Sequence, residues 1–283
     1  LLVQSKTLMN KFCHLSLHSE YSISDGLINM ADLAKKTSDL GFESVAITDN
    51  SNLFGFVNFY QTMRENGIKP ICGSEIIFEG ENSKGQLTLL VRDLKGYKNL
   101  MKLISHANTH GKRKNECLIS LEILKEHKEG LIMFTGGLES QIANSVLADK
   151  YDLAEKQARF FKDIFQENFF LEITRVGFEN EEKCNNSLIE ISKSSDIPII
   201  ASNRVRFLNQ NEFESHETRV SIQSGYVLSD PRRKRDYQEN QYLKSFEEMQ
   251  ELFKDIPEAI DNAFEVSKKC NLEIKTGIYV LPD

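Results

Sequence analysis

Residues 44–78 read SVAITDNSNLFGFVNFYQTMRENGIKPICGSEIIF, and this stretch sets the fold class. Two runs rich in β-branched and aromatic residues, 44–48 and 70–78, have the composition of strands. Between them, over 56–65, apolar residues recur every three or four positions, as in a helix with one buried face. A strand, a helix and a second strand in this order predict a βαβ unit.

The same alternation continues along the chain in both directions. Further strands are predicted at 12–17, 86–91, 131–135, 169–174 and 197–202, and helices at 30–40, 97–108, 121–127, 140–147, 152–165 and 181–194. Seven strands, each followed by a helix, predict an α/β fold built on a parallel sheet. Such a sheet can stay open and doubly wound or close into a barrel, and periodicity does not choose between them. After residue 202 a helical tail is predicted, at 212–224, 245–253 and 257–269.

The composition excludes several classes of protein. The 283 residues carry 35 Lys and Arg against 42 Asp and Glu, and the net charge of −7 argues against a surface that coats nucleic acid. With 40% hydrophobic and 27% charged residues, the chain fits a soluble globular protein of one large domain or two small ones. No apolar run approaches the roughly 20 residues of a membrane span, and the first ten residues lack a secretory signal. Five scattered cysteines without a C-x-x-C pair indicate a reducing compartment, so we expect a cytoplasmic protein.

Polar residues collect where the predicted strands end, which is where parallel α/β proteins place their chemistry. On the first strand three polar residues alternate, so their side chains point the same way: His14, Ser16 and His18. Carboxylates follow near the next strand ends, and two arginines follow the last strand: Asp25, Asp49, Glu75, Arg204 and Arg206. Imidazoles and carboxylates could begin a zinc or manganese site, but two arginines in the same ring argue against it.

Weaker candidates favour structural roles. The run Arg232 to Arg235 could bind phosphate, but flanking carboxylates favour a solvated loop. His106 and His110 have the spacing of a metal chelate without a third ligand near in sequence, so an exposed helix end is favoured. His216 is expected to bond to a neighbour rather than to catalyse. The glycines at 136–137 could cradle a phosphate, although a tight strand-to-helix connection is favoured.

Several long motifs resemble one family. FCHLSLHSEYSISDG at 12–26, AITDNSNLFG at 46–55 and IKPICGSE at 68–75 are similar to the opening of bacterial DNA polymerase III alpha subunits, their polymerase and histidinol phosphatase (PHP) domain. Shorter matches follow in the same order: GYKNL at 96–100, EGLI at 129–132, GG at 136–137, ASN at 201–203, QYLKS at 241–245 and YVLP at 279–282.

The resemblance implies a distorted seven-stranded (βα)7 barrel of the PHP type with a helical C-terminal extension. It divides the chain into an N-terminal extension over 1–11 and a PHP domain over 12–283, with the barrel ending at about 208. The sequence stops without a terminating pattern, so we expect a fragment whose polymerase carboxylates would lie beyond Asp283.

Departures from the family's metal site accompany the matches. Active PHP domains resemble phosphoesterases with three metal ions held by His, Asp, Glu and sometimes Cys. Four residues stand where the resemblance places ligands: His18, Asp25, Asp49 and Glu75. Seven other ligand positions carry different residues: Ser16, Asn50, Gln86, Gly137, Val176, Arg204 and Arg206. The pattern resembles the proteobacterial branch, in which the metals are thought to be lost. No cofactor is therefore expected, with residual manganese or zinc as the remaining option.

Carboxylates that no longer share a divalent cation must be neutralised in another way, because several buried carboxylates cannot all stay ionised cheaply. The guanidinium of Arg204 or Arg206 is expected within about 2.7–3.2 Å of Asp25, Asp49 or Glu75. The alternative places both arginines on the surface.

Two functions compete. In the first, the chain is the PHP module of a replicative DNA-directed DNA polymerase, a nucleotidyltransferase; it is inactive as a phosphoesterase, stiffens the polymerase and docks the proofreading exonuclease subunit in DNA replication. Its partners would be that subunit and the rest of the polymerase, with DNA met only through the full-length polymerase and no membrane. In the second, it is an active metal-dependent phosphoesterase, a 3′–5′ exonuclease or a pyrophosphatase. Whether the fragment itself is an enzyme stays open at this point.

Overall fold

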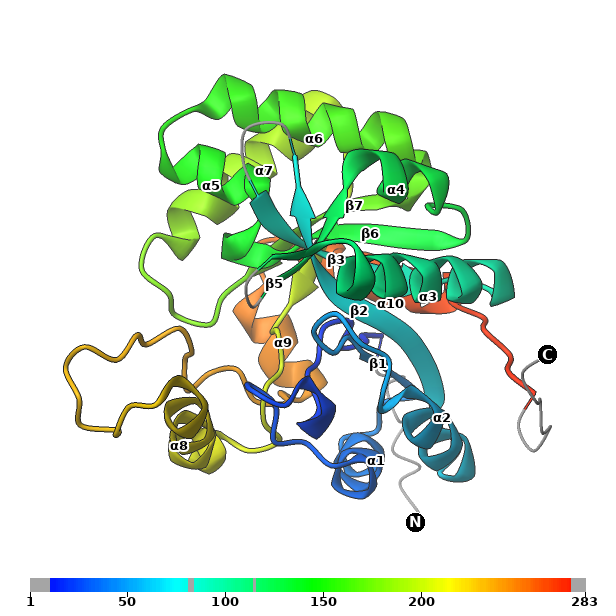
Figure 1. Cartoon of the computed structure of the whole chain (residues 1–283), viewed down its shortest axis with the longest axis vertical. Coiled ribbons are helices and arrows are strands. Elements are labelled where there is room, and N and C mark those ends of the chain that lie inside the picture. Colours follow the sequence, from blue (N-terminus) through cyan, green and yellow to red (C-terminus); the bar gives the residue numbers. More distant parts are fainter. Residues whose placement is uncertain (1–10, 81–83, 114–115, 276–283) are drawn as a thin grey trace, which may run out of the picture.

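The computed structural model describes residues 11–80, 84–113 and 116–275 (Figure 1). Residues 1–10 of the predicted extension over 1–11 and the YVLP motif lie outside these residues, and the domain boundaries stay a prediction. Within the described ranges the strands are β1 (Ser44–Ile47), β2 (Lys69–Glu79), β3 (Lys84–Val91), β4 (Lys112–Arg113), β5 (Glu116–Ser120), β6 (Leu131–Thr135), β7 (Phe169–Thr174) and β8 (Ile199–Ser202). Six of the seven predicted strands are confirmed.

Each predicted helix is present, with its ends moved by a few residues. They are α1 (Met30–Asp39), α2 (Phe56–Glu65), α3 (Leu94–Thr109), α4 (Leu121–Glu126), α5 (Gln141–Leu147), α6 (Tyr151–Phe165), α7 (Glu181–Ser195), α8 (Phe213–Ser224), α9 (Phe246–Leu252) and α10 (Pro257–Lys269). α6 shows why they form, since Ala154, Ala158, Phe161 and Phe165 recur at helical spacing and are buried. No helix in the described part of the chain is long and apolar enough to cross a membrane.

The sheet runs in the order β4-β5-β2-β3-β6-β7-β8, and β1 pairs with β2. Its parallel pairs are β1 with β2, β2 with β5, β6 with β7, and β7 with β8. The expectation of an all-parallel sheet is wrong at β3, which runs antiparallel to β2 and β6. The sequence contained the reason, because a parallel crossover needs about a dozen residues or more and the predicted strands 70–78 and 86–91 are too close for one.

The predicted strand 12–17 is also wrong as a regular strand, yet its backbone closes the barrel. On one side the carbonyls of His14 and Leu17 accept hydrogen bonds from β1, at 2.9 Å from Ala46 N and 2.8 Å from Thr48 N. On the other side Val205 N donates to Ser16 O at 3.0 Å, and His18 N donates to Val205 O at 2.9 Å. These hydrogen bonds are divided between the β1 side and Val205, and the pairing with Val205 is an isolated parallel bridge from Leu17. The result is a ring of strands and extended segments, the distorted barrel that was expected.

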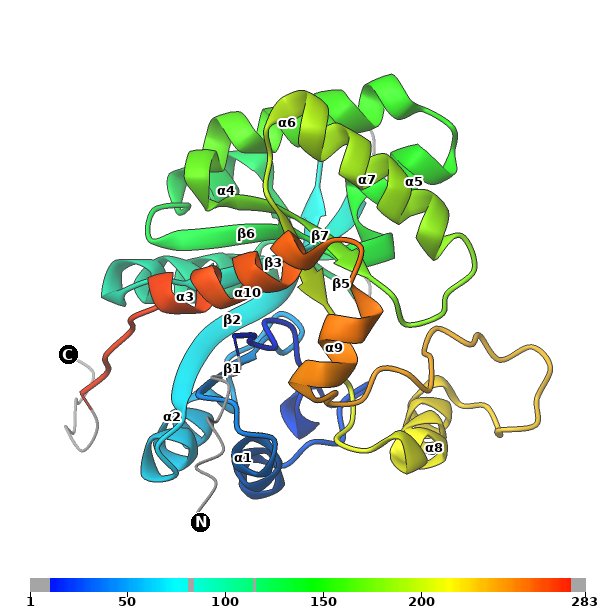
Figure 2. The same cartoon turned by 180° about the vertical axis from the view of Figure 1, so that it is seen from behind.

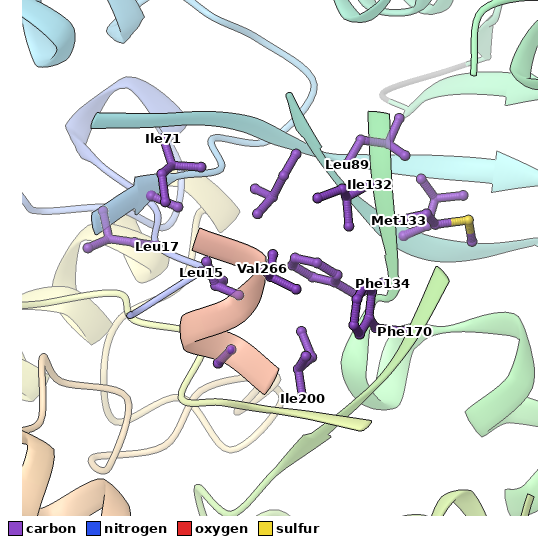
Figure 3. Packing of buried hydrophobic residues seen from close by; sticks show 14 of the residues in the cluster. Leu15, Leu17, Ile71, Leu89, Ile132, Met133, Phe134, Phe170, Ile200 and Val266 are labelled. Carbon is purple, nitrogen blue, oxygen red and sulfur yellow. The ribbon is translucent and has the colours of Figure 1, made fainter. Parts of the chain in front are cut away.

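The interior of the ring is apolar, and helix α10 closes one end of it. Figure 3 shows side chains from several strands meeting Val266 of α10. Asn262 Nδ2 donates to Ile199 O at 2.8 Å, and Lys69 Nζ donates to Ser267 O at 2.9 Å, so α10 lies at the first residues of β8 and β2. Figure 2 shows α10 running across the strands. The other end, where these parallel strands finish, holds the polar residues.

Candidate functional site

Glu75 of β2 lies at the centre of the polar end of the barrel, and its side chain is fully buried. Ser16 Oγ donates to its Oε1 at 2.8 Å, and Gln86 Nε2 donates to its Oε2 at 2.6 Å. Two guanidinium groups donate to the same Oε2, Arg204 Nη2 at 3.0 Å and Arg206 Nη2 at 3.3 Å. The expected contact between an arginine and a carboxylate is therefore present, and both arginines are buried rather than on the surface.

His18 links Glu75 to a second carboxylate. Its Nε2 lies 2.9 Å from Glu75 Oε2, and its Nδ1 lies 3.0 Å from Asp25 Oδ2. Asp25 also accepts a hydrogen bond of 3.1 Å from the Tyr237 hydroxyl, and Arg206 Nε lies 3.6 Å from its Oδ2. Tyr237 comes from the segment after α8, so a residue from the helical tail completes the cluster.

A third buried carboxylate, Glu172 of β7, lies on the other side of Arg204. Arg204 Nη1 is 3.4 Å from Glu172 Oε2, and Arg204 Nη2 is 3.7 Å from the half-exposed Glu139. The Arg204 side chain runs past Gly137, where an added Cβ would lie 3.1 Å from Arg204 Cδ. Gly137 also has a φ of +60°, a region that disfavours side chains. A glycine at 137 thus leaves room for the arginine.

Burial and charge act in opposite directions on these groups. Burial alone would raise the pKa of Glu75, but the charges of Arg204, His18 and Arg206 outweigh it and hold the pKa well below 4.5. Burial and Arg206 would lower the pKa of His18, yet Asp25 and Glu75 raise it from 6.5 to about 9. The core of the site is therefore an imidazolium and two guanidinium groups around ionised carboxylates.

Glu172 behaves differently. Burial raises the pKa of Glu172 from 4.5 to about 7, and the charge of Arg204 offsets only part of that effect. One guanidinium shared between two carboxylates stabilises the nearer ionised group more strongly, and Arg204 lies closer to Glu75.

Asp49, at the end of β1, is held by neutral donors. Its Oδ1 accepts from Ser19 N at 2.7 Å and from Ser22 Oγ at 2.6 Å, and its Oδ2 accepts from Ser19 Oγ at 2.8 Å. Neighbouring Asn50 is exposed, and its Oδ1 accepts from Ser51 Oγ at 3.3 Å. Asp49 therefore lies outside the charged cluster, and so does the Asn50 side chain.

A family model described as "PHP domain" matches residues 14–176. The chain belongs to the PHP domain family. This PHP domain is 42% identical over 275 residues to DNA polymerase III subunit alpha of Pseudomonas aeruginosa and 40% over 276 residues to that of Vibrio cholerae. The protein of that name in Escherichia coli is 39% identical over 275 residues.

Each of these alignments covers 96% of this chain but only 23–24% of the relative, so the chain spans roughly a quarter of their length. Among solved structures, one is titled as a two-domain protein of Bacteroides vulgatus containing a predicted PHP-like metal-dependent phosphoesterase. It matches with a TM-score of 0.45 and 14% identity, covering 89% of this chain and 62% of that one.

The PHP domain brings most, but not all, of its suspected ligand positions together. Within hydrogen-bond or ion-pair distance of one another lie Ser16, His18, Asp25, Glu75, Gln86, Arg204 and Arg206. Val176 is buried, and its backbone N donates to Glu181 at 3.1 Å. His14 is buried away from the cluster, with its Nε2 2.9 Å from Lys244 O, and burial lowers its pKa to about 4.

A divalent cation does not fit this arrangement well. Ligands of zinc or manganese must offer lone pairs, whereas guanidinium groups carry only donors and positive charge. Arg204 and Arg206 approach the same Glu75 oxygen that a metal would need. Across the described ranges, no group of three or more His, Cys, Asp or Glu side chains is arranged to hold a metal ion.

Sequence reasoning missed several residues of the site. Glu172 could have been found from the sequence, since it is the one charged residue in the run FFLEIT of β7. Tyr237 could not, because it lies far along the chain in a segment without periodicity. Ser19 and Ser22 gave only the weak signal of hydroxyls beside a carboxylate-bearing loop.

The weaker candidates have structural partners. His216 Nε2 lies 2.8 Å from Asp25 O, behind the cluster. In the basic loop Arg232 pairs with Asp230 at 2.8 Å, and buried Arg233 pairs with Glu217 at 2.5 Å. The rings of His106 and His110 are stacked with centroids 5.0 Å apart on the exposed end of α3.

Proposed function

We propose that this PHP domain is part of a DNA polymerase III alpha subunit and that it does no metal chemistry. It acts as a structural scaffold of the polymerase and as a docking site for the proofreading exonuclease subunit. Support comes from identity of 39–42% to such subunits over nearly the whole chain. Its partners would be that exonuclease and the rest of the polymerase, with DNA reached only through the complete polymerase, in the cytoplasm.

One observation carries the loss of metal chemistry: two buried guanidinium groups converge on Glu75 Oε2. Phosphoester hydrolysis with two metals requires ions about 3.5–4 Å apart, each with room for substrate oxygens. Here the charge that the metals would supply comes from Arg204, Arg206 and protonated His18. The polar end of the barrel is therefore locked by internal ion pairs, which suits a rigid support better than a catalyst.

Metal content tests this proposal. The purified chain, dialysed after loading with manganese or zinc, is expected to retain less than one metal ion per chain by elemental analysis. A phosphatase assay with added manganese or zinc is expected to give no turnover above a metal-only blank. Two or three retained ions together with activity would restore the phosphoesterase interpretation.

A variant that rebuilds the ligand set is the matched control. The combined changes Ser16→His, Asn50→His, Arg204→Asp and Arg206→His add imidazole and carboxylate donors and remove two positive charges. We expect this variant to bind manganese or zinc more tightly than the parent in a titration. Equal affinity of the two chains would contradict the idea that the arginines displaced the metal.

Docking is tested separately. The chain and a purified exonuclease subunit, mixed at micromolar concentrations, are expected to co-elute in size-exclusion chromatography. Elution as two separate peaks would contradict the docking role without affecting the metal result.

A further inference from the structure

A groove of about 450 Å³ lies on the outside of the barrel, away from the Glu75 cluster. Its walls come from α5 and α6, and Phe78 at the end of β2 and Leu121 at the start of α4 complete it. Figure 1 shows α4, α5 and α6 in the upper part of the view and α8 at the lower left. The residues that line the groove include no member of the Glu75 cluster.

Helix α6 carries a second apolar stripe that faces this groove. Its inward stripe, with Ala158 and Phe161, is buried in the core. Leu153 and Phe160 also line the groove, and they remain 43% and 39% exposed. Their spacing of seven residues, with Gln157 between them, puts them on one face of the helix. An amphipathic helix needs one apolar stripe for its own fold, so the second one calls for a partner.

The charged side chains that line the groove have one sign. Lys150 and Lys156 line it, and the residues that line it include no carboxylate. Neither ammonium group has an ion pair or side-chain hydrogen bond with any residue that the structure describes. Lys125 adds a third cation, with its Nζ 5.3 Å from the centre of the Phe160 ring. The acidic residues next to these lysines in sequence are already paired, Asp149 with Lys183 at 2.8 Å and Glu155 with Arg159 at 2.8 Å.

We propose that this α5–α6 groove binds a segment of the exonuclease subunit in which apolar side chains are flanked by carboxylates. The inference rests on the docking role proposed above and specifies the surface at which docking occurs. The apolar side chains of the segment contact Leu153 and Phe160, and its carboxylates pair with Lys150 and Lys156. This chemistry follows from charge complementarity, since the chain as a whole carries −7 but the groove is lined by cations only.

The test measures affinity for the purified exonuclease subunit by isothermal titration calorimetry. Phe160→Asp introduces a negative charge at the groove, and we expect at least tenfold weaker binding. The double variant Lys150→Glu/Lys156→Glu is expected to bind several-fold more weakly and to lose most of the salt dependence of the parent. Both sites are exposed, so circular dichroism and thermal unfolding should match those of the parent.

Met101→Asp is the matched control, because Met101 lies on α3 and is 38% exposed, close to the value for Phe160. It is expected to bind like the parent. Unchanged affinity in the Phe160 and lysine variants would overturn the placement while the docking role stands. Failure of the parent itself to bind would overturn both. If Phe160→Asp instead abolished self-association in sedimentation experiments, a second copy of the chain would be the occupant and the proposal would be wrong.

Discussion

Glu75, within β2, and Asp49, just after the neighbouring strand β1, stand at two suspected ligand positions and are both buried, yet their partners differ in charge. Around Glu75 three partners are charged, two guanidinium groups and an imidazolium, beside the neutral donors Ser16 and Gln86. Around Asp49 they are neutral: one backbone amide and two hydroxyls. The buried Glu75 carboxylate is thus surrounded mainly by opposite charge, whereas the Asp49 carboxylate has neutral hydrogen-bond donors.

The two solutions differ in what they demand from the rest of the chain. The donors to Asp49 come from one loop, since Ser19 and Ser22 are near each other in sequence. The Glu75 arrangement joins the first and last parts of the barrel, because Arg204 and Arg206 come after β8. We therefore expect substitutions at Glu75's partners to affect the whole barrel and those at Asp49's partners to have smaller effects.

The largest effect is expected for Arg204→Ala. It leaves Glu75 and Glu172 buried with less positive charge, which should lower the free energy of unfolding by about 3–5 kcal/mol. Urea denaturation of parent and variant measures the difference. Arg113→Ala is the control, because the exposed Arg113 pairs with Glu79 at 2.6 Å on the surface and its loss should cost about 1 kcal/mol or less. Adding Glu75→Gln to Arg204→Ala should recover part of the loss, and strict additivity would contradict the pairing.

The next effect depends on pH and concerns Glu172, whose pKa is raised by burial to about 7. A carboxyl group with a raised pKa in the folded state favours folding below its ordinary pKa and loses that contribution as pH rises through 7. Glu172→Gln cannot ionise, so its stability relative to the parent should increase between pH 4.5 and 8, by about 2–3 kcal/mol. Denaturant midpoints at pH 5 and pH 8 measure it. An identical difference at both pH values would show that Glu172 does not titrate there.

The smallest effect is expected at the neutral arrangement. Ser22→Ala removes one of three donors to Asp49, and the free energy of unfolding should fall by about 1.5 kcal/mol, because hydrogen bonds to charged groups are worth about 1.5–3 kcal/mol. Ser24→Ala, which removes only a hydrogen bond to Ser22 O, should change it by about 0.5 kcal/mol or less. A loss for Ser22→Ala as large as that for Arg204→Ala would break the comparison between the two carboxylates.

Much of the fold followed from periodicity, and the failures have physical causes. Long amphipathic helices such as α6 were found because their buried faces repeat every three to four residues. The strand β5 escaped notice because its five residues alternate only briefly, and segment 12–17 misled because its hydrogen bonds are split between β1 and Val205. The antiparallel direction of β3 depended on connection length, which was available but not used.

The candidate site was predictable where its residues lie near the ends of predicted strands. Ser16, His18, Glu75 and Gln86 were placed by that rule together with the resemblance to PHP domains, and they do contact one another. Tyr237 could not be placed, since no local pattern tells which residue of an irregular segment returns to the barrel. The sequence could not show that the pKa is lowered for Glu75 and raised for Glu172, because this difference depends on which carboxylate lies nearer to Arg204 in space.

The closure of the barrel through residues 12–18 has a consequence in time. His18 is made early, whereas its hydrogen-bond partner Val205 is made nearly 190 residues later. At about 5–20 residues per second, that delay on the ribosome is about 10–40 s. During it the edge of segment 12–18 has no partner from 203–207, and Asp25 and Glu75 have no guanidinium beside them. The barrel is therefore closed, and the charges at its polar end are neutralised, in one late step of synthesis and folding.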